Sequence, residues 1–308
     1  MDYLMMTSSP CLIFSAMNNC NINLFYPMYN FTYTLKLKEE LYGVEICFAK
    51  DGWLLLVRGD HNMFFLNPFT SARIEITYFP LGFNFDAVCF TSTPTSSDCT
   101  VFGIVSSEDY EVTIFINRCR EETWEIYSLE NKTRWGVYNC LCNSVSFIPS
   151  QSNPVLYGGL FYCFDEEGKL GSFDLERGSW NVFRTSCRHD MSEYDQNFLV
   201  ECDGNLLSVF IGPYGRWIRV CRLDQSKMLW KDVNSLGDWM LFLSEKTSLS
   251  AKATVRGTGN KIYIQRFYAN LGVFYSLATQ KYHTFDGGYC LENYYDTTEE
   301  VQCTWMMT

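Results

Sequence analysis

Histidine is the usual general base near neutral pH, and this 308-residue chain contains three of them. His61, His189 and His283 are far apart in the sequence, and each lies in or beside a predicted turn or surface strand. No Gly-x-Ser-x-Gly string provides a nucleophile elbow. The sequence therefore offers few bases for Ser/His/Asp or Cys/His catalysis, and we expect no catalytic residue.

Clusters of carboxylates are the next candidates for acid and base chemistry. They occur at Asp165-Glu166-Glu167, at Glu193 and Asp195, and at Asp296, Glu299 and Glu300. Such pairs could serve a hydrolase, but the string DEEGK is typical of a hairpin tip, where charged side chains are solvated. We therefore expect a protein that is not an enzyme, and we keep a hydrolase as the alternative.

Metal and cofactor sites are poorly supported by the spacing of the ligand types. Cys140 and Cys142 are separated by one residue, whereas zinc sites generally use Cys-x₂₋₄-Cys with a second ligand pair. Residues 257–259 read Gly-Thr-Gly but lack the third glycine and the following helix of a dinucleotide site. We expect no metal ion and no cofactor.

Arginine and aromatic side chains offer a different chemistry, the recognition of a protein partner. Arg216 and Arg222 fall on one face of a predicted strand and Arg219 on the other, so the three do not form an anion clamp. Residues 132–138, 187–195 and 265–271 connect predicted sheets and combine the residue types enriched at interfaces. Our candidate contacts for an unidentified target protein are Arg134, Trp135, Tyr138, Arg188, Tyr194, Arg266, Phe267 and Tyr268.

Strands must position these side chains, because helical periodicity is scarce. The best helical window, residues 235–244, contains Gly237 and predicts at most one or two turns of helix. Aromatic residues make up 17% of the chain, which suits strands better than helices.

One hairpin pattern recurs six times along the chain. In each copy an apolar residue before a turn is paired with a bulky residue seven or eight positions later; the pairs are Tyr26/Tyr33, Leu66/Ile74, Ile116/Trp124, Phe173/Trp180, Leu223/Trp230 and Tyr275/Tyr282. The second members advance by 41 to 56 residues, close to the length of a propeller blade.

Sheets of three or four short strands must stack face on face, so this repeat predicts an all-β, single closed β-propeller over residues 1–308. We expect six blades, with seven as the alternative. The first unit is one strand short and residues 301–306 form a leftover strand, so we expect the N- and C-terminal strands to share one blade. A large β-sandwich or two stacked barrels would not explain the regular spacing.

Charge and composition limit the partners. The formal net charge is −11, which opposes binding to nucleic acid or to an anionic membrane surface. The 14 cysteines lie mostly inside apolar runs, and the N-terminus lacks the basic region of a secretory signal. We expect reduced thiols and an intracellular protein, cytoplasmic or nuclear, which also disfavours a secreted sugar-binding propeller.

Several strings between about Pro10 and Phe285 resemble the plant F-box/kelch-repeat protein family, whose C-terminal part is a KIB-type β-propeller domain. The strings are KDGWLLLVRGD, FFLNPFT, GGLFYCFDEEGKLGSFD, NFLVECDGNLLSVF, VCRLDQSKMLWKDVNSLGD and MLFLSEKTSLS. The resemblance implies a protein-interaction propeller that presents a target for ubiquitination. In that family an N-terminal F-box docks the Skp-type adaptor of a cullin ligase. No F-box is detected in this sequence, so we expect adaptor and cullin only if an F-box is supplied elsewhere.

Overall fold

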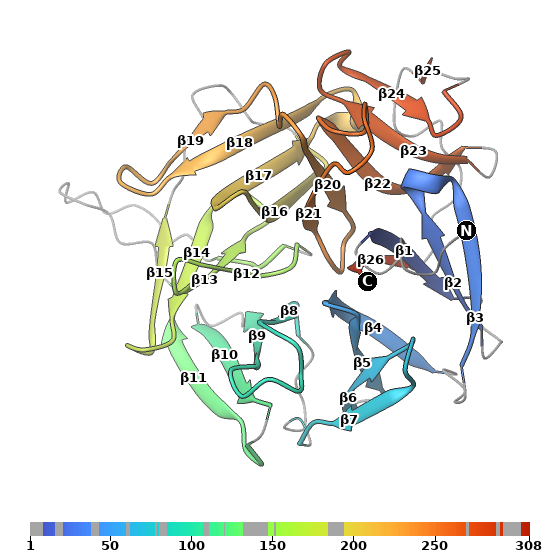
Figure 1. Ribbon diagram of the computed structural model, residues 1–308. Coiled ribbons are helices and arrows are strands. Elements are labelled where there is room, and N and C mark those ends of the chain that lie inside the picture. Colours follow the sequence, from blue (N-terminus) through green and yellow to red (C-terminus); the bar gives the residue numbers. More distant parts are fainter. Residues whose placement is uncertain are drawn as a thin grey trace.

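The computed structural model describes residues 9–15, 21–37, 43–59, 62–77, 79, 85–106, 111–119, 121–131, 147–150, 152–183, 194–268, 271–287, 290–291 and 303–308. Their strands form six sheets arranged as blades around a central channel (Figure 1). Within these residues, two 3₁₀ turns interrupt the strands, η2 (Pro27–Tyr29) and η3 (Pro213–Gly215). None of the helical turns in this part of the chain is long and apolar enough to cross a bilayer.

Four-stranded sheets make up the first five blades, and in each the first-named strand is the one nearest the channel. Blade 1 contains β26 (Cys303–Met307), β1 (Pro10–Ser15), β2 (Asn21–Tyr26) and β3 (Phe31–Lys36). Blade 2 contains β4 (Val44–Lys50), β5 (Trp53–Arg58), β6 (Asn62–Asn67) and β7 (Ala72–Glu75). Blade 3 contains β8 (Ala87–Phe90), β9 (Thr100–Ser106), β10 (Glu111–Arg118) and β11 (Glu125–Glu130).

Blades 4 and 5 repeat this arrangement. Blade 4 contains β12 (Val155–Tyr157), β13 (Leu160–Phe164), β14 (Leu170–Asp174) and β15 (Ser179–Phe183). Blade 5 contains β16 (Gln196–Cys202), β17 (Asn205–Ile211), β18 (Ile218–Asp224) and β19 (Leu229–Asp232). The predicted six-bladed propeller is confirmed, and the alternative of seven blades is wrong.

Blade 6 departs from the repeat, because its sheet has six strands. The order is β21 (Leu249–Lys252), β20 (Trp239–Leu243), β22 (Lys261–Tyr268), β23 (Leu271–Ser276), β24 (Lys281–Thr284) and β25 (Cys290–Leu291). β20 pairs antiparallel with β21 and parallel with β22, so a hairpin is added on the channel side. The helical turn expected within residues 235–244 is therefore wrong, since β20 occupies much of that window and most of its side chains are buried.

The two ends of the chain meet in blade 1, as predicted. β26 pairs antiparallel with β1, and Leu12 lies opposite Trp305. The Thr308 hydroxyl donates to the Ser9 carbonyl at 2.9 Å. The Trp305 indole is buried and donates to the Leu243 carbonyl of blade 6 at 2.9 Å, so the last strand fixes two neighbouring blades.

The recurring hairpin owes its turn to an aspartate or asparagine. The Asn67 side chain accepts hydrogen bonds from the amides of Phe69 and Thr70, and Asp174 and Asp224 accept equivalent bonds in blades 4 and 5. Four residues after each acceptor the backbone has a positive φ, at Ser71, Gly178 and Met228. The side chain replaces a backbone acceptor and the positive φ reverses the chain, which explains why the hairpin repeats.

Apolar side chains fill the seams between neighbouring blades, and aromatic rings dominate several of them. Phe102 of blade 3 stacks on Phe161 of blade 4 with ring centroids 4.4 Å apart. Phe65 of blade 2 meets Phe90 of blade 3 at 5.1 Å, and Phe242 of blade 6 meets Trp305 of blade 1 at 5.0 Å. Each blade covers a face that it cannot bury alone, so the seams form the hydrophobic core.

Candidate site at one mouth of the central channel

The sequence-derived contact candidates fall into three groups. Arg134, Trp135, Tyr138 and Arg188 lie outside the described residues. Tyr194 precedes β16 and is half-buried at one end of the channel.

The third group, Arg266 to Tyr268, lies within β22, so the expectation of a connecting segment is wrong there. Arg266 is 9% exposed, and the Phe267 ring packs against Phe14 and Phe25 of blade 1. Phe267 is thus part of the hydrophobic seam between blades 6 and 1. The aromatic and basic composition of this segment reflects blade packing.

The innermost strands β4, β8 and β16 run in the same direction along the channel. Their first residues surround one opening, which we call the acidic mouth because Glu45, Asp86, Glu166, Asp195 and Glu245 line its cavities. Their last residues, such as Lys50 of β4 and Phe90 of β8, surround the opposite mouth.

Polar side chains cross the channel between these mouths. The Thr247 hydroxyl accepts a hydrogen bond from the Ala49 amide of blade 2 at 2.9 Å. The Asn153 side chain accepts one from the Ser248 amide at 2.8 Å, and thereby joins blades 4 and 6. The Ser152 hydroxyl accepts a hydrogen bond from the Leu199 amide of blade 5 at 3.0 Å. We call the buried set Ser152, Asn153, Thr247 and Ser248 the channel plug.

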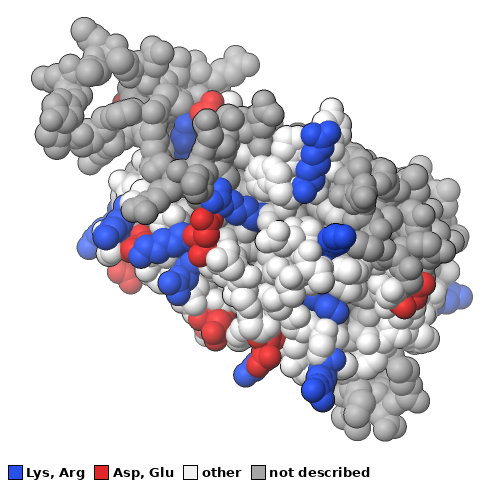
Figure 2. Space-filling model, turned by 90° about the horizontal axis from the view of Figure 1, so that it is seen from above, with Lys and Arg blue, Asp and Glu red and all other residues white. Residues whose placement is uncertain are grey.

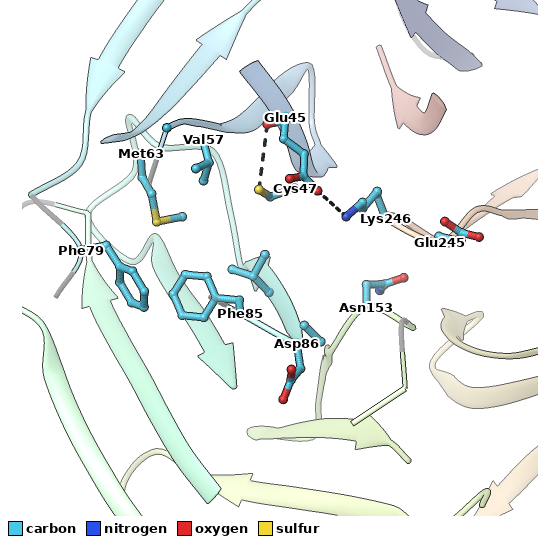
Figure 3. A pocket seen from close by; sticks show the side chains of 13 residues that line it. Glu45, Cys47, Val57, Met63, Phe79, Phe85, Asp86, Asn153, Glu245 and Lys246 are labelled. Carbon is cyan, nitrogen blue, oxygen red and sulfur yellow. Dashed lines mark hydrogen bonds and ion pairs between the residues drawn. The ribbon is translucent and has the colours of Figure 1, made fainter. Parts of the chain in front are cut away.

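Above the plug, the acidic mouth holds a cavity of about 620 Å³ (Figure 3). One wall is apolar and is made by Val57, Met63, Phe79, Phe85, Ala87 and Val88. Glu45, Glu245 and Lys246 lie away from this wall, whereas Asp86 lies beside Phe85 and Asn153 belongs to the plug (Figure 3). The lining combines an apolar surface with three carboxylates and one ammonium group.

Hydrogen bonds and ion pairs fix two of these three carboxylates. Glu45 pairs with Lys246 at 2.7 Å. Burial alone would lower the pKa of Lys246, but the Glu45 carboxylate offsets this and the pKa is raised. Asp86 accepts bonds from the Ser106 amide and hydroxyl at 2.7 and 2.8 Å. Glu245 forms no hydrogen bond or ion pair with any residue that the structure describes.

Cys47 contributes a thiol to the lining of this cavity. Burial raises the pKa of the thiol to about 12, and the neighbouring Glu45 carboxylate acts in the same direction. A thiol that stays protonated near neutral pH is a poor nucleophile. Cys47 therefore contributes to packing in the wall of the cavity.

A second cavity of about 340 Å³ opens at the same mouth and shares Glu245 with the first. Tyr194 lines it and donates its hydroxyl proton to the Glu166 carbonyl at 2.8 Å. Burial raises the pKa of Tyr194 to about 12, so the phenol stays neutral. Tyr194 is the sequence-derived candidate that the structure places at the acidic mouth.

The Asp-Glu-Glu-Gly-Lys turn also lies at this mouth, but its charges are not simply solvated as expected. Asp165 and Lys169 are 1% and 6% exposed and form an ion pair at 2.8 Å. Burial raises the pKa of Asp165, while the hydrogen bond and charge of Lys169 act in the opposite direction. The correction has a physical cause, because Asp165 also accepts the Glu167 and Lys169 amides and thereby builds the turn.

Most of the remaining candidates for chemistry fall on residues that the structure does not describe. Cys140, Cys142, His61, His189, Glu193 and Asp296 lie outside the described residues. Within the described ranges, no group of three or more His, Cys, Asp or Glu side chains could hold a metal ion. His283 lies in β24, where its ring stacks on Phe274.

The outer edge of the ring differs from the mouth because its charges are mixed in sign. On β18 and β19, Arg219 pairs with Asp232 and Lys231 with Asp224, each at 2.6 Å. Figure 2 shows Lys and Arg side chains standing among Asp and Glu on one face of the molecule. Exposed pairs of this kind contribute little to stability and present no single sign of charge to a partner.

Sequence reasoning missed most residues of the acidic mouth. Glu245 and Lys246 belong to the string MLFLSEKTSLS, which carried part of the family resemblance, so a signal was present. Glu45 and Asp86 lie at or just before the start of innermost strands, but which strands face the axis depends on ring closure. The spacing of residues along the chain does not contain that information.

Comparisons with known proteins agree with this architecture. Residues 24–286 match the family model described as the KIB1-4 β-propeller. The chain is 29% identical over 283 residues to the F-box/kelch-repeat protein At1g57790 of Arabidopsis thaliana, covering 89% of this chain and 76% of the relative. It is 27% identical to the F-box/kelch-repeat protein At3g18720 of the same plant, covering 78% of this chain and 62% of the relative.

Proposed function

This chain belongs to the KIB1-4 β-propeller family, and from that premise we propose that it is a non-catalytic module that binds a target protein at the acidic mouth. Its relatives are F-box and F-box/kelch-repeat proteins, and a propeller within such proteins is suited to protein recognition. The bound segment of the target enters the cavity of about 620 Å³ above the channel plug.

The observation that carries this proposal is the two-sided lining of that cavity. An apolar wall around Met63, Phe79 and Phe85 offers the burial that anchors an aliphatic or aromatic side chain. Glu245 lines the same cavity and has no described ion-pair partner, so a basic side chain of the target supplies the missing charge. The target segment thus combines an apolar residue with an adjacent Lys or Arg.

The non-catalytic character is part of the proposal. It is supported by the state of Asp165, the deeply buried carboxylate of the mouth, which is engaged by Lys169 and by two backbone amides. A general acid or base needs access to substrate and a free proton site. Asp165 is committed to the turn that it stabilises.

The place of the chain in ubiquitination is also a proposal. The aligned part covers between 62% and 76% of the two F-box/kelch-repeat relatives, so the chain corresponds to a portion of such proteins. We assign to this portion the recognition of the ubiquitination target, in the cytoplasm or nucleus. Docking of a Skp-type adaptor and cullin then requires an F-box supplied elsewhere.

A charge reversal tests the acidic mouth. Proteins captured from native tissue by the wild-type chain are compared with those captured by Glu245→Lys and by Glu176→Lys. Glu176 is exposed in the β14–β15 turn at the outer edge of blade 4, so it provides the same charge change away from the channel. We expect Glu245→Lys to weaken binding of the target about tenfold, or about 1.4 kcal/mol, with no effect of Glu176→Lys.

The result is interpreted on variants of equal thermal stability. Partners retained equally by all three proteins would contradict binding at the acidic mouth. Loss of the partner with both variants would indicate a general charge effect and would also contradict it. Salt provides a second readout, because the affinity for a basic segment falls as ionic strength rises.

A further inference from the structure

Two cysteines face one another in blade 3, away from the acidic mouth. The ladder between β9 and β10 places Thr100 opposite Arg118, so Cys99 and Cys119, one residue further, continue the same register. The Cys119 amide donates to the Cys99 carbonyl at 3.0 Å, which extends the pairing by one step. Directly opposed residues of antiparallel strands have Cα atoms roughly 4.5–5.5 Å apart, within the range that a disulfide spans.

The two side chains are also in contact. The Cys119 side chain and the Ser92 amide are the neighbours of Cys99 that favour its ionised form. These two neighbours lower the pKa of Cys99, although burial opposes them. The pKa of Cys119 is raised, first by the side chain of Cys99 and second by burial. Of the two thiols, Cys99 is therefore the one that ionises more readily.

This environment differs from that of the other thiols in blades 3 and 4. Cys89 and Cys163 are buried in strands, and burial raises the pKa of both. Cys99 is 1% exposed, whereas its partner Cys119 is only half-buried and keeps part of its surface in solvent. A small oxidant can therefore reach the pair across Cys119, whereas Cys89 and Cys163 present a protonated sulfur inside the core.

We propose that Cys99 and Cys119 are a reversible oxidation site, at which hydrogen peroxide converts the opposed thiols into a cross-strand disulfide. The Cys99 thiolate attacks one peroxide oxygen, the O–O bond breaks, and Cys99 becomes a sulfenic acid. The released hydroxide takes the Cys119 proton and forms water. The Cys119 thiolate then attacks the Cys99 sulfur, and the S–O bond breaks as the S–S bond forms. The second hydroxide takes a proton from solvent, so peroxide gains the two electrons that the sulfurs lose.

The disulfide links two connections of blade 3. Cys99 lies at the end of the segment that follows β8. In this segment the Thr91 hydroxyl donates to the Asp98 carbonyl at 3.2 Å, and Thr91 lines the opposite mouth. Cys119 begins the β10–β11 turn, which contacts blade 2 through the Trp124 indole and the Thr77 carbonyl at 3.1 Å. The disulfide therefore joins the segment that lines the opposite mouth to the turn that contacts blade 2. A thiol reductant cleaves this disulfide and separates the two segments.

Peptide mapping tests the site on the purified chain. The protein is titrated with hydrogen peroxide, free thiols are alkylated, and digested peptides are analysed by mass spectrometry. We expect alkylation to be lost at Cys99 and Cys119 together, at least about tenfold faster than at Cys89 and Cys163. We also expect one linked peptide pair, which dithiothreitol separates.

Two variants separate the roles of the sulfurs. In Cys119→Ser the sulfenic acid on Cys99 has no resolving thiol, so dimedone should trap it there. In Cys99→Ser the remaining thiol should resist the same dose of peroxide. Cys163→Ser is the matched control and should leave the linked peptide unchanged.

Several outcomes would overturn the proposal. One is equal oxidation of Cys99, Cys89 and Cys163, and another is a linked peptide that joins Cys99 to a different cysteine. The proposal would also be overturned if Cys99 and Cys119 both remained available for alkylation after a peroxide dose that oxidises the thiols of the unfolded chain. The wild-type map alone decides among these results, so the test does not depend on the folding of any variant.

Discussion

The seams between blades and the channel at the centre of the ring are both buried, but they are built from opposite chemistry. The seams are apolar, as where Phe102 stacks on Phe161. The channel is crossed by the polar side chains of Asn153 and Thr247, each hydrogen-bonded to a backbone amide of another blade. Apolar burial is non-directional and supplies stability, whereas hydrogen bonds fix positions and add little net energy.

The same blade repeat thus provides both the stability of the ring and the floor of a candidate binding site. The seams hold the six blades together, and the channel plug sets the floor of the acidic mouth. Substitutions in the seams should therefore affect stability most, and substitutions of uncharged channel residues should affect the shape of the cavity more than stability. Four changes of decreasing effect test that ranking.

Trp305→Ala should give the largest loss of stability. The Trp305 side chain is 1% exposed, packs on Phe242 and donates to the Leu243 carbonyl, so truncation opens the seam between blades 1 and 6. We expect a loss of about 3–5 kcal/mol in the free energy of unfolding, measured by denaturant titration. A loss under about 1 kcal/mol would break the comparison, because the seam would then not dominate stability.

Lys169→Met should be nearly as destabilising, by about 3 kcal/mol, because it leaves the Asp165 carboxylate buried without its counter-charge. The double variant Asp165→Asn with Lys169→Met removes both charges and should recover part of the loss. Equal stability of the single and double variants would show that the uncompensated charge is not the cause. Both proteins are compared by denaturant titration at pH 7.

Asn153→Ala should cost about 1–2 kcal/mol, since the buried amide of Ser248 loses its acceptor. Asn181→Ala is the matched control, because Asn181 is exposed on β15, and it should change stability by less than about 0.5 kcal/mol. Removal of the plug residue should also weaken target binding at the acidic mouth. If Asn153→Ala bound its target with unchanged affinity, the plug would not shape the site.

The smallest effect should come from buried thiols at alkaline pH. Burial raises the pKa of Cys202 to about 11 and of Cys303 to about 12, from an ordinary value of 9.0. A raised folded pKa gives stability that is complete below pH 9 and is lost as pH rises toward these values, because the unfolded chain ionises first. Between pH 8 and pH 9 each such thiol should lower the unfolding free energy by roughly 0.4 kcal/mol.

Thermal unfolding at the two pH values measures this dependence. Cys202→Ala should have a shallower decline than wild type, because one thiol no longer ionises on unfolding. A decline that is identical in both proteins would assign the alkaline loss to other groups.

The sequence predicted the ring well because the hairpin carries its own local signals. Phe173 and Trp180, Leu223 and Trp230, and Tyr275 and Tyr282 are direct cross-strand partners, as their pairing implied. The predicted pairs of blades 1, 2 and 3 are not direct partners: Tyr33 lies opposite Leu24, Ile74 opposite Phe65, and Ile116 opposite Glu125. In blade 1 the difference comes from η2, which is inserted after Tyr26. Turn geometry sets the register, and the spacing of apolar residues does not reveal such an insertion.

The channel could not be predicted to the same extent. Asp165 was expected at a solvated tip, yet it is buried because blade 5 covers it, with the Asn197 side chain donating to its carbonyl at 3.0 Å. The parallel pairing of β20 with β22 depends on the space left inside blade 6, which is a property of the closed ring. Contacts between residues distant in sequence determine both features.

Because β26 pairs with β1, blade 1 cannot be completed until the C-terminal strand has been synthesised. The ribosome releases β1 first, while Cys303–Met307 is added about 290 residues later, so blade 1 exposes an unpaired edge throughout synthesis. At the usual elongation rate of about 5–20 residues per second, this open interval lasts on the order of tens of seconds. The nascent chain is therefore most exposed to chaperones and to aggregation shortly before the ring closes.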